Sequence, residues 1–335
     1  MRENKELLNV NDLIVQYVSQ DETVHAVNKV SFNLFEEETI GLVGETGAGK
    51  TTIALSIMGL ISDPPGKITN GEIFYNDLDL RKFSQRQMRK VRGKEISMIF
   101  QDPMTSLNPI DSVGDQITEV IKLHERVSRI TATKKAMEML ELVGIPSTRY
   151  SDYPHQFSGG MQQRIDIAIA LACNPKLLIA DEPTTALDVT IQAQILEMIE
   201  NLKKRLKTSI ILITHDLGIV AKMCDRVFVI YAGEIVESGN LIQIFDQMNH
   251  PYTIGLFGSL PNIAQSNLEK KKLNPIPGLM PDPTNLPIGC KFFPRCKYKE
   301  SVCDLEVQSL IEVDRGHLVR CWKHQEVMGA VSGVK

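Results

Sequence analysis

The first residues whose types and spacing could do chemistry form an octapeptide near position 50. GETGAGKT, residues 44–51, fits the pattern G-x-x-x-x-G-K-(S/T). Its glycines allow the backbone to wrap an anion, so that successive N–H groups and the start of a following helix face phosphate. The alternative is a fortuitous glycine-rich turn. The residues expected to bind a nucleoside triphosphate are Gly44, Glu45, Thr46, Gly47, Ala48, Gly49, Lys50, Thr51 and Thr52.

Within this loop, two side chains have specific expected roles. Lys50 is expected to reach the β- and γ-phosphates, and the hydroxyl of Thr51 is expected to ligate Mg²⁺. A second acidic site supports this interpretation, because KLLIADEP, residues 176–183, ends an apolar run with two carboxylates. Asp181 is expected to hold Mg²⁺ through the coordination shell of the ion, and Glu182 is expected to polarise the attacking water. Alternatively, the acid pair caps the next helix.

Two further polar residues follow short apolar runs. Gln101 ends EISMIFQ and His215 ends IILITH. Ligands of open α/β sheets gather at the carboxyl ends of the strands, so each residue is expected to contact the metal, the water or the γ-phosphate. The alternative for each is an ordinary surface position. Together with Glu182, these two residues form the predicted catalytic set, and Gln101 is also a predicted Mg²⁺ ligand.

The elements that position these residues alternate in type along the chain. Residues 8–40 alternate apolar and polar, which predicts antiparallel strands, and TIGLV predicts a strand directly before the loop. ISMIFQ, KLLIAD and SIILITHD have the apolar character of strands buried on both faces of a parallel sheet. Helical periodicity fills the intervals, and FVIYAGEIVESG predicts a closing hairpin. This alternation indicates a doubly wound α/β domain.

Composition restricts the remaining possibilities. The 335 residues are 43% apolar and 23% charged, and the net charge of −4 gives no overall basic field, so nucleic acid is not an expected partner. The N-terminal residues lack the apolar region of a secretory signal, and no apolar run approaches the length of a membrane span. The expected location is cytoplasmic, where a disulfide framework is unlikely and a membrane role would depend on protein partners.

The segment FSGGMQQRIDIAIAL, residues 157–171, adds a further pattern. With the phosphate loop, Gln101, LLIADEPTTALD and His215 in this order, the first 250 residues resemble the ATPase subunit of an ATP-binding cassette (ABC) transporter. The family more often has LSGGQ where this chain has FSGGM. The resemblance implies a P-loop NTPase (RecA-like) parallel sheet core with an N-terminal antiparallel β subdomain and an inserted α-helical subdomain at about 103–175.

That resemblance assigns roles to more residues. Two ATPase subunits would pair head to tail, so that each signature segment closes on the γ-phosphate bound by its partner. The predicted signature residues are Ser158, Gly159, Gly160 and Gln162. Ser158 is also expected to cap its helix. Asp188 would communicate across the interface. Tyr17 lies at about the family's adenine-stacking position, and the alternative for it is packing within a strand.

More narrowly, QDPMTSLNPI at 101–110, HPYTIGLFGSLP at 250–261 and the proline- and cysteine-rich tail resemble the peptide-importer branch. The resemblance implies ATP hydrolysis that energises uptake of di- or oligopeptides. The implied partners are a second, identical or related ATPase subunit, two membrane permeases bound through the helical subdomain, and indirectly an extracytoplasmic peptide-binding protein. The chain would then lie peripherally on the inner face of the cell membrane. The alternatives are nickel or another small solute as substrate, or a non-transport cassette ATPase with redox-regulated activity.

Beyond residue 250 the character of the chain changes. The predicted domains are an ATPase domain, 1–250, and an irregular extension, 251–335, with a charged linker at 266–274. Cys290, Cys296, Cys303 and Cys321 follow C-x5-C-x6-C-x17-C, a spacing that names no metal. The family resemblance suggests a [4Fe-4S] cluster on these four residues, with zinc or free thiols as alternatives. Nearby, His317 and His324 could replace a cysteine around zinc but are expected at the surface.

Overall fold

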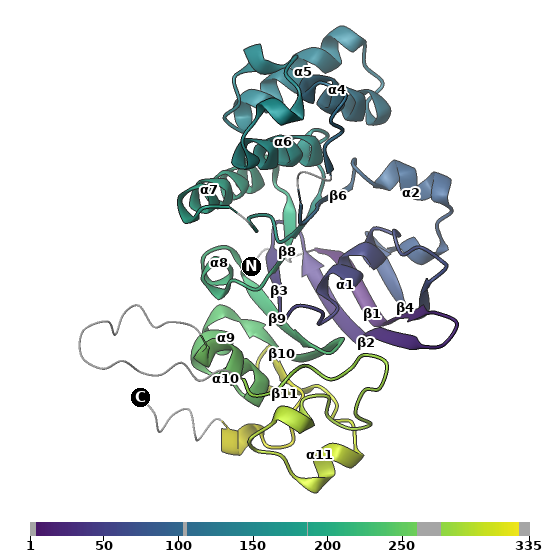
Figure 1. Ribbon diagram of the computed structural model, residues 1–335, viewed down its shortest axis with the longest axis vertical. Coiled ribbons are helices and arrows are strands. Elements are labelled where there is room, and N and C mark those ends of the chain that lie inside the picture. The colour runs from purple at the N-terminus through teal and green to yellow at the C-terminus, as the bar shows by residue number, and fades with distance from the viewer. Residues whose placement is uncertain (1–4, 103–105, 186, 260–275, 328–335) are drawn as a thin grey trace, which may run out of the picture.

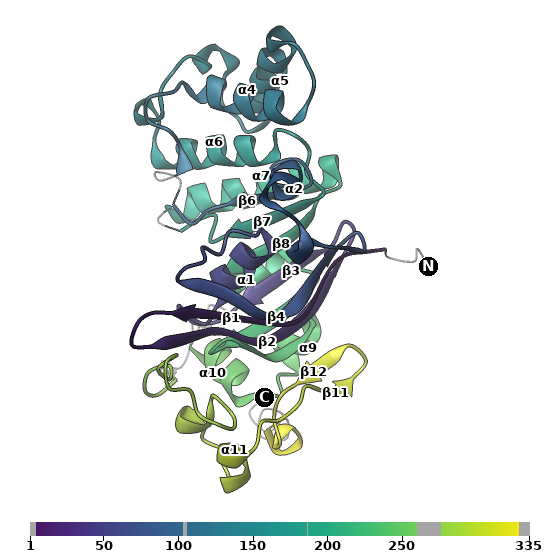
Figure 2. The same ribbon diagram turned by 90° about the vertical axis from the view of Figure 1, so that its right-hand side faces the viewer.

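The computed structural model describes residues 5–102, 106–185, 187–259 and 276–327. The predicted linker at 266–274 lies outside the described residues, as do positions 103–105 of the predicted helical subdomain. Helices α4, α5 and α6 form a layer at one end of the molecule, and the extension containing α11 forms the opposite end (Figure 1). The two β-sheets lie between them. Figure 2 shows the N-terminal strands crossing the middle of the molecule beside helix α1.

The N-terminal layer is a four-stranded antiparallel sheet in the order β2-β1-β4-β5. Its strands are β1 (Glu6–Val18), β2 (Thr23–Phe35), β4 (Gly66–Tyr75) and β5 (Leu78–Asp79). Alternate apolar residues of β1, including Leu8 and Val10, are fully buried. The predicted antiparallel strands are therefore confirmed, because a period of two places one face of the sheet against the core.

The central sheet contains eight strands in the order β11-β12-β10-β9-β3-β8-β7-β6. The strands before the extension are β3 (Thr39–Val43), β6 (Ile96–Ile99), β7 (Leu177–Asp181), β8 (Ser209–Thr214), β9 (Arg226–Tyr231) and β10 (Glu234–Asn240). Strands β9, β3, β8, β7 and β6 are mutually parallel. In β7, Leu178 and Leu177 belong to separate apolar clusters on the two faces of the sheet. The predicted burial on both faces is confirmed.

Helices occupy the intervals between these strands. The segments predicted from periodicity form α5, α6 and α7, and the α/β class is confirmed. The α-helices within the described ranges include α1 (Lys50–Ile57), α2 (Gln85–Val91), α4 (Val113–His124), α5 (Arg129–Leu142), α6 (Gly159–Leu171), α7 (Val189–Leu206), α8 (Leu217–Met223), α9 (Leu241–Asp246), α10 (Pro251–Gly258) and α11 (Ser301–Leu305). Short 3₁₀ turns occur at η1 (Leu80–Lys82), η2 (Ser147–Arg149), η3 (Pro154–Gln156) and η5 (Phe293–Arg295).

The extension is more regular than its sequence indicated. Strands β11 (Ile311–Asp314) and β12 (His317–Val319) form a hairpin, and β12 pairs with β10. Gly316 lies in the connecting turn with φ 73°. This hairpin continues the central sheet because β10 would otherwise leave its backbone hydrogen-bonding groups exposed at an edge. The prediction of a wholly irregular tail is therefore wrong for this segment.

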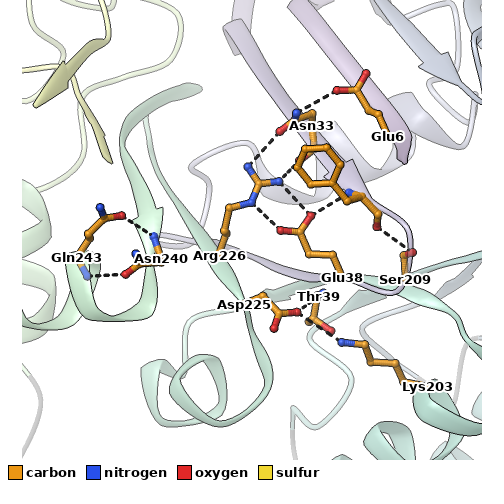
Figure 3. Close-up of polar contacts among 11 residues, drawn as sticks. Glu6, Asn33, Glu38, Thr39, Lys203, Ser209, Asp225, Arg226, Asn240 and Gln243 are labelled. Carbon is orange, nitrogen blue, oxygen red and sulfur yellow. Dashed lines mark hydrogen bonds and ion pairs between the residues drawn. The ribbon is translucent and has the colours of Figure 1, made fainter. Parts of the chain in front are cut away.

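Arg226 joins the two sheets close to the strand that leads into the phosphate loop (Figure 3). Its Nε and Nη2 donate to the carboxylate of Glu38 at 2.6 and 3.0 Å, and Nη2 also donates to the carbonyl oxygen of Asn33 at 2.8 Å. Next to it, the N–H of Thr39 donates to Oδ2 of Asp225 at 2.8 Å. These bonds hold the start of β3 against β9, and thereby position the residues that follow β3.

Candidate active site

The phosphate loop lies between β3 and α1 and depends on glycine at both ends. Gly44 has φ 154° and Gly49 has φ 99°. A Cβ atom at Gly44 would lie 2.1 Å from the carbonyl oxygen of Ile230, and one at Gly49 would lie 2.3 Å from that of Ala26. Gly49 is also the N-cap residue of α1, so no side chain caps this helix. The first N–H groups of α1 therefore face the loop, as anion binding requires.

Lys50 is buried and turns back onto the loop. Its Nζ donates to the carbonyl oxygens of Gly44 and Glu45 at 2.8 and 2.9 Å. Burial lowers the pKa of Lys50, while Glu182 and Asp181 oppose that shift. Among the other loop residues, the N–H of Ala48 donates to the Glu45 carbonyl at 3.2 Å, while Thr46, Gly47 and Thr51 are exposed. The side chain of Thr52 is partly exposed at the next position of α1.

Asp181 is the last residue of β7 and is only 3% exposed. Burial raises its pKa, and a hydrogen bond with the side chain of Thr51 partly opposes that effect. This contact brings the predicted Mg²⁺ ligand on α1 next to the acidic strand end. A buried carboxylate is costly to ionise, and the charge of Lys50 offsets only part of that cost, so the pair forms a suitable environment for a further cation.

Three neighbouring strand ends bring the predicted catalytic residues together. Gln101 follows β6 and donates from Nε2 to Oε2 of Glu182 at 3.2 Å. His215 follows β8, and its Nδ1 lies 3.1 Å from Oε1 of Glu182. Glu182 itself follows β7 and has a positive φ of 47°. The parallel order β8-β7-β6 explains this convergence, because parallel strands end at the same edge of a sheet.

The environment of Glu182 favours its charged form. Burial would raise its pKa, but hydrogen bonds with His215 and Thr185 outweigh burial and lower it. The Thr185 hydroxyl donates to Oε2 of Glu182 at 2.9 Å. Thr185 was not identified from the sequence, although its position three residues after Glu182 in DEPTT is compatible with such a local bond. The carboxylate can therefore accept a proton or orient water while its own oxygens remain fixed.

The segment predicted to bind the partner's nucleotide surrounds the start of α6. Ser158 is the N-cap residue, but its side chain makes no capping hydrogen bond, contrary to the expected cap. Gly159 has open space where a Cβ would lie, so the helix start is accessible. Gln162 is placed differently from Gly159 and Gly160: its Nε2 donates to the carbonyl oxygens of Pro154 and Phe157 at 2.8 and 3.2 Å. Gln162 thus holds the approach to the helix.

Two other predicted residues lie on other elements. Asp188 is the N-cap residue of α7 and makes no side-chain cap bond. Tyr17 lies on β1 opposite Val24 and Gly66, and its ring is close to where a Cβ of Gly66 would lie. The ring therefore packs along the N-terminal sheet and remains partly exposed.

The four cysteines of the extension are half-buried and form no disulfide. Burial raises the pKa of Cys290 to about 11 and that of Cys321 to about 12, and the neighbouring thiols contribute to both shifts. The N–H of Cys290 also donates to the carbonyl oxygen of Cys303 at 2.7 Å. Nevertheless, no group of three or more His, Cys, Asp or Glu residues within the described parts of the chain is arranged to hold a metal ion.

His317 was expected at the surface, and this prediction is wrong. It is 1% exposed, and its Nε2 lies 2.8 Å from Oε1 of Glu237 on β10. Pairing of β12 with β10 buries the ring beside a carboxylate, which a reading of the local sequence could not anticipate. His324 is half-buried, with Nδ1 3.1 Å from the carbonyl oxygen of Cys321.

The extension also supplies two contacts to the phosphate loop that sequence reasoning missed. Nη1 of Arg295 lies 2.9 and 3.1 Å from the two carboxylate oxygens of Glu45. The N–H of Glu45 donates to the Tyr252 hydroxyl at 2.9 Å. Positions separated by more than 200 residues meet here, and no local pattern indicates such a contact.

Comparison with known proteins agrees with this arrangement. Residues 27–185 match the family described as ABC transporter, and residues 236–303 match the family described as oligopeptide/dipeptide transporter, C-terminal region. The oligopeptide transport ATP-binding protein OppD of Bacillus subtilis is 52% identical over 318 residues, which is 94% of this chain and 88% of OppD. The dipeptide transport ATP-binding protein DppD of the same organism is 49% identical over 320 residues, 95% of each chain.

Solved structures show the same fold. The ATP-binding cassette MJ0796, in a dimeric post-hydrolysis state bound to ADP and Pi, is 26% identical with a TM-score of 0.64, covering 70% of this chain and 99% of that one. CbiO1 of Clostridium perfringens, part of the transporter complex cbiONQ, has a TM-score of 0.62 at 29% identity, covering 72% of this chain and 91% of that one. None of the helices in the described ranges is long and apolar enough to cross a bilayer. This chain belongs to the ATP-binding subunits of ABC transporters, in the group that carries the oligopeptide/dipeptide transporter C-terminal region.

Proposed function

We propose that this protein hydrolyses ATP to drive import of oligopeptides or dipeptides through membrane permeases, at whose inner face it is held. The observation that carries the proposal is the convergence of Gln101, Glu182 and His215 beside the phosphate loop. The names of OppD and DppD support peptides as the transported class. We place the boundary between the ATPase domain and the extension after residue 250, where α10 begins.

In the proposed reaction, N–H groups of the loop and of α1 bind the phosphates, and Lys50 leaves its two carbonyl partners to reach them. Glu182 orients the attacking water and takes its proton, while His215 holds the Glu182 carboxylate in place. Thr51, Gln101 and the buried Asp181 fit a magnesium ion because they offer oxygen ligands beside the loop. When bound, Mg²⁺ neutralises charge on the β- and γ-phosphates.

The second half of each catalytic site comes from another subunit in this proposal. The start of α6 is open at Gly159, and Ser158 has no capping bond to occupy it. An exposed helix N-terminus next to glycines suits a phosphate supplied from outside this chain. The dimeric state of MJ0796 supports such pairing. Ser158, Gly159 and Gly160 would then contact the γ-phosphate, Asp188 would lie at the interface, and Tyr17 would stack on adenine.

A basic cleft supports permease binding at the helical subdomain. The cleft has a volume of about 1070 Å³ and lies between the α2–β6 region and helices α4 and α6. Its positively charged lining residues are Arg86, Arg89, Lys90, Arg92, Lys94 and Arg126. We infer that the cleft receives a cytoplasmic helix of a permease, and that this helix carries acidic residues that face the rim of the cleft, because complementary charge favours docking. Movement of the cleft with Gln101 would transmit hydrolysis to the permease.

We also infer that the cysteine quartet holds a [4Fe-4S] cluster, with zinc as the alternative metal. In three of the four residues, Cys290, Cys296 and Cys321, burial raises the thiol pKa, and a backbone N–H two positions further on faces the sulfur and partly opposes that rise. Such N–H contacts stabilise thiolate ligands. The sulfurs would have to converge on binding, because the described residues form no ready metal site. About four irons and four sulfides per chain would support the cluster, whereas one zinc without sulfide would exclude it.

The central test replaces Glu182 with Gln in the complex assembled with its permeases. Glu182→Gln should still bind ATP, because the loop and Lys50 are intact, but ATP turnover should fall by at least ~100-fold. Peptide uptake should stop with it. Substantial residual hydrolysis would remove Glu182 from its proposed role, and uptake unaffected by loss of hydrolysis would refute the transport function.

A further inference from the structure

We propose that Arg295 of the extension is a positioning residue for ATP binding, because it neutralises Glu45 and holds the phosphate loop in its binding conformation. This inference rests on the proposed binding of ATP at residues 44–51. It adds a role for the C-terminal extension in the ATPase site itself. The segment around Arg295 belongs to η5, a short turn 250 positions away from Glu45 in the sequence.

The ion pair is well defined, and its arginine side chain is shielded from solvent. Nη1 of Arg295 lies 2.9 Å from Oε2 and 3.1 Å from Oε1 of Glu45, and 3.3 Å from the Tyr231 hydroxyl oxygen. The side chain of Arg295 is 6% exposed and that of Glu45 is 29% exposed. Nε of Arg295 also donates to the carbonyl oxygen of Pro277 at 2.9 Å. The guanidinium is therefore held in place independently of Glu45.

A second contact fixes the backbone of the same loop residue. The N–H of Glu45 donates to the hydroxyl of Tyr252 at 2.9 Å, and Tyr252 is fully buried. The Tyr252 ring packs against Tyr231, with centroids 4.5 Å apart, and against Phe292 at 5.5 Å. Side chain and backbone of Glu45 are thus both held by residues that follow position 230. The loop is clamped from outside the segment that binds phosphate.

These two contacts also affect Lys50 and the loop backbone, which must bind the phosphates. The carbonyl oxygen of Glu45 accepts hydrogen bonds from Nζ of Lys50 at 2.9 Å and from the N–H of Ala48 at 3.2 Å. A displacement of Glu45 would therefore move both Lys50 and Ala48. In addition, an unpaired Glu45 carboxylate would place a negative charge inside a loop that binds a polyanion. Arg295 removes that repulsion before ATP arrives.

The test measures the equilibrium dissociation constant for MgATP on the full chain. Arg295→Ala should raise it about tenfold, since the Glu45 charge is then unpaired. Adding Glu45→Gln to Arg295→Ala should restore most of the lost MgATP affinity. Arg295→Lys should lose less MgATP affinity than Arg295→Ala. A purely structural role predicts the opposite for the double variant, which would then bind no better than Arg295→Ala. Such a result overturns the proposal, as does unaltered binding by Arg295→Ala.

Arg320→Ala is the matched control. Arg320 also joins the extension to β10, because its Nε donates to the carbonyl oxygen of Ile235 at 2.9 Å, and its Nη1 donates to the carbonyl oxygen of Gln308 within the extension; neither bond involves the loop. The Arg320→Ala variant should have lower thermal stability but unchanged ATP affinity. Equal losses of ATP affinity in Arg320→Ala and Arg295→Ala would refute a specific role for Arg295. If Arg295→Ala does not fold, Arg295→Lys with and without Glu45→Gln carries the comparison.

Lys50→Ala distinguishes failure of the proposed ATP site from failure of the role given to Arg295. If Lys50→Ala binds ATP normally, the site at residues 44–51 is refuted. If Lys50→Ala loses ATP binding but Arg295→Ala binds ATP normally, only the role of Arg295 is refuted.

Discussion

Nδ1 of His215 lies 3.1 Å from Oε1 of Glu182, and the two residues follow adjacent parallel strands. Glu182 is also held through its other oxygen by Gln101 and Thr185, so both carboxylate oxygens have partners. This contact makes the histidine an orienting group for the proposed base. Its consequences for rate and pH dependence can be separated experimentally.

Replacing His215 should slow hydrolysis more than it weakens ATP binding. His215→Ala is expected to lower kcat by about 100-fold, because the Glu182 carboxylate loses an orienting partner. The hydrogen bond with His215 helps to lower the pKa of Glu182, so its loss should raise that pKa and move the acid limb of the rate–pH profile to higher pH. His25→Ala, a half-buried histidine on β2, is the control. An unshifted acid limb would contradict the proposed coupling.

Acid should destabilise the protein through His250. This residue is fully buried, and burial, with a smaller effect of Arg320, lowers its pKa from 6.5 to about 3. The unfolded chain therefore binds an extra proton between these values, and stability falls as the pH drops below the unfolded pKa. Between pH 7 and pH 5 the loss should be about 2 kcal/mol, measured by denaturant unfolding.

The variant His250→Asn tests this assignment. Nδ1 of His250 accepts a hydrogen bond from the N–H of Tyr252 at the start of α10. The side-chain oxygen of asparagine can accept the same bond. The variant should therefore keep α10 but lose most of the added acid sensitivity. Acid destabilisation equal to that of the parent protein would show that other groups cause it.

Arg226 should contribute to stability well above the level of an ordinary surface ion pair. Arg226→Met would leave the Glu38 carboxylate, which is 11% exposed, without its bidentate partner. The expected loss in unfolding free energy is about 2–3 kcal/mol. Lys5→Met removes the exposed Lys5–Glu36 pair and should cost less than ~0.5 kcal/mol. Similar losses for the two variants in denaturant unfolding would refute the distinction.

Charge in the basic cleft should control association with the permeases. Lys90→Glu reverses one charge of its lining and should weaken association about tenfold at low ionic strength, with a smaller effect as salt rises. Lys222→Glu makes the same change at an exposed position of α8 and should have little effect. Binding to permeases in detergent or nanodiscs measures both. Equal effects of the two variants would exclude the cleft as a specific docking site.

The sequence alone was sufficient to predict features defined by local pattern. A strand, a glycine-rich loop and a helix in direct succession appear in the structure as β3, residues 44–49 and α1. The strand ends carrying Gln101, Glu182 and His215 could be expected to meet, because successive parallel strands share an edge. Helical periodicity similarly located α5, α6 and α7. Each individual element is indicated by a short local pattern, where backbone geometry limits the alternatives.

Only the tertiary structure decided which distant segments support the site. The pairing of β12 with β10 buries His317 against Glu237, although the local sequence indicated a surface residue. Likewise, the packing of the extension against the ATPase domain brings Arg295 to Glu45 across 250 positions. A local pattern shows which face of an element is apolar, but it does not identify the partner of that face. Partners are selected by shape and charge complementarity over the whole fold, and these contacts therefore emerge only when the chain is assembled.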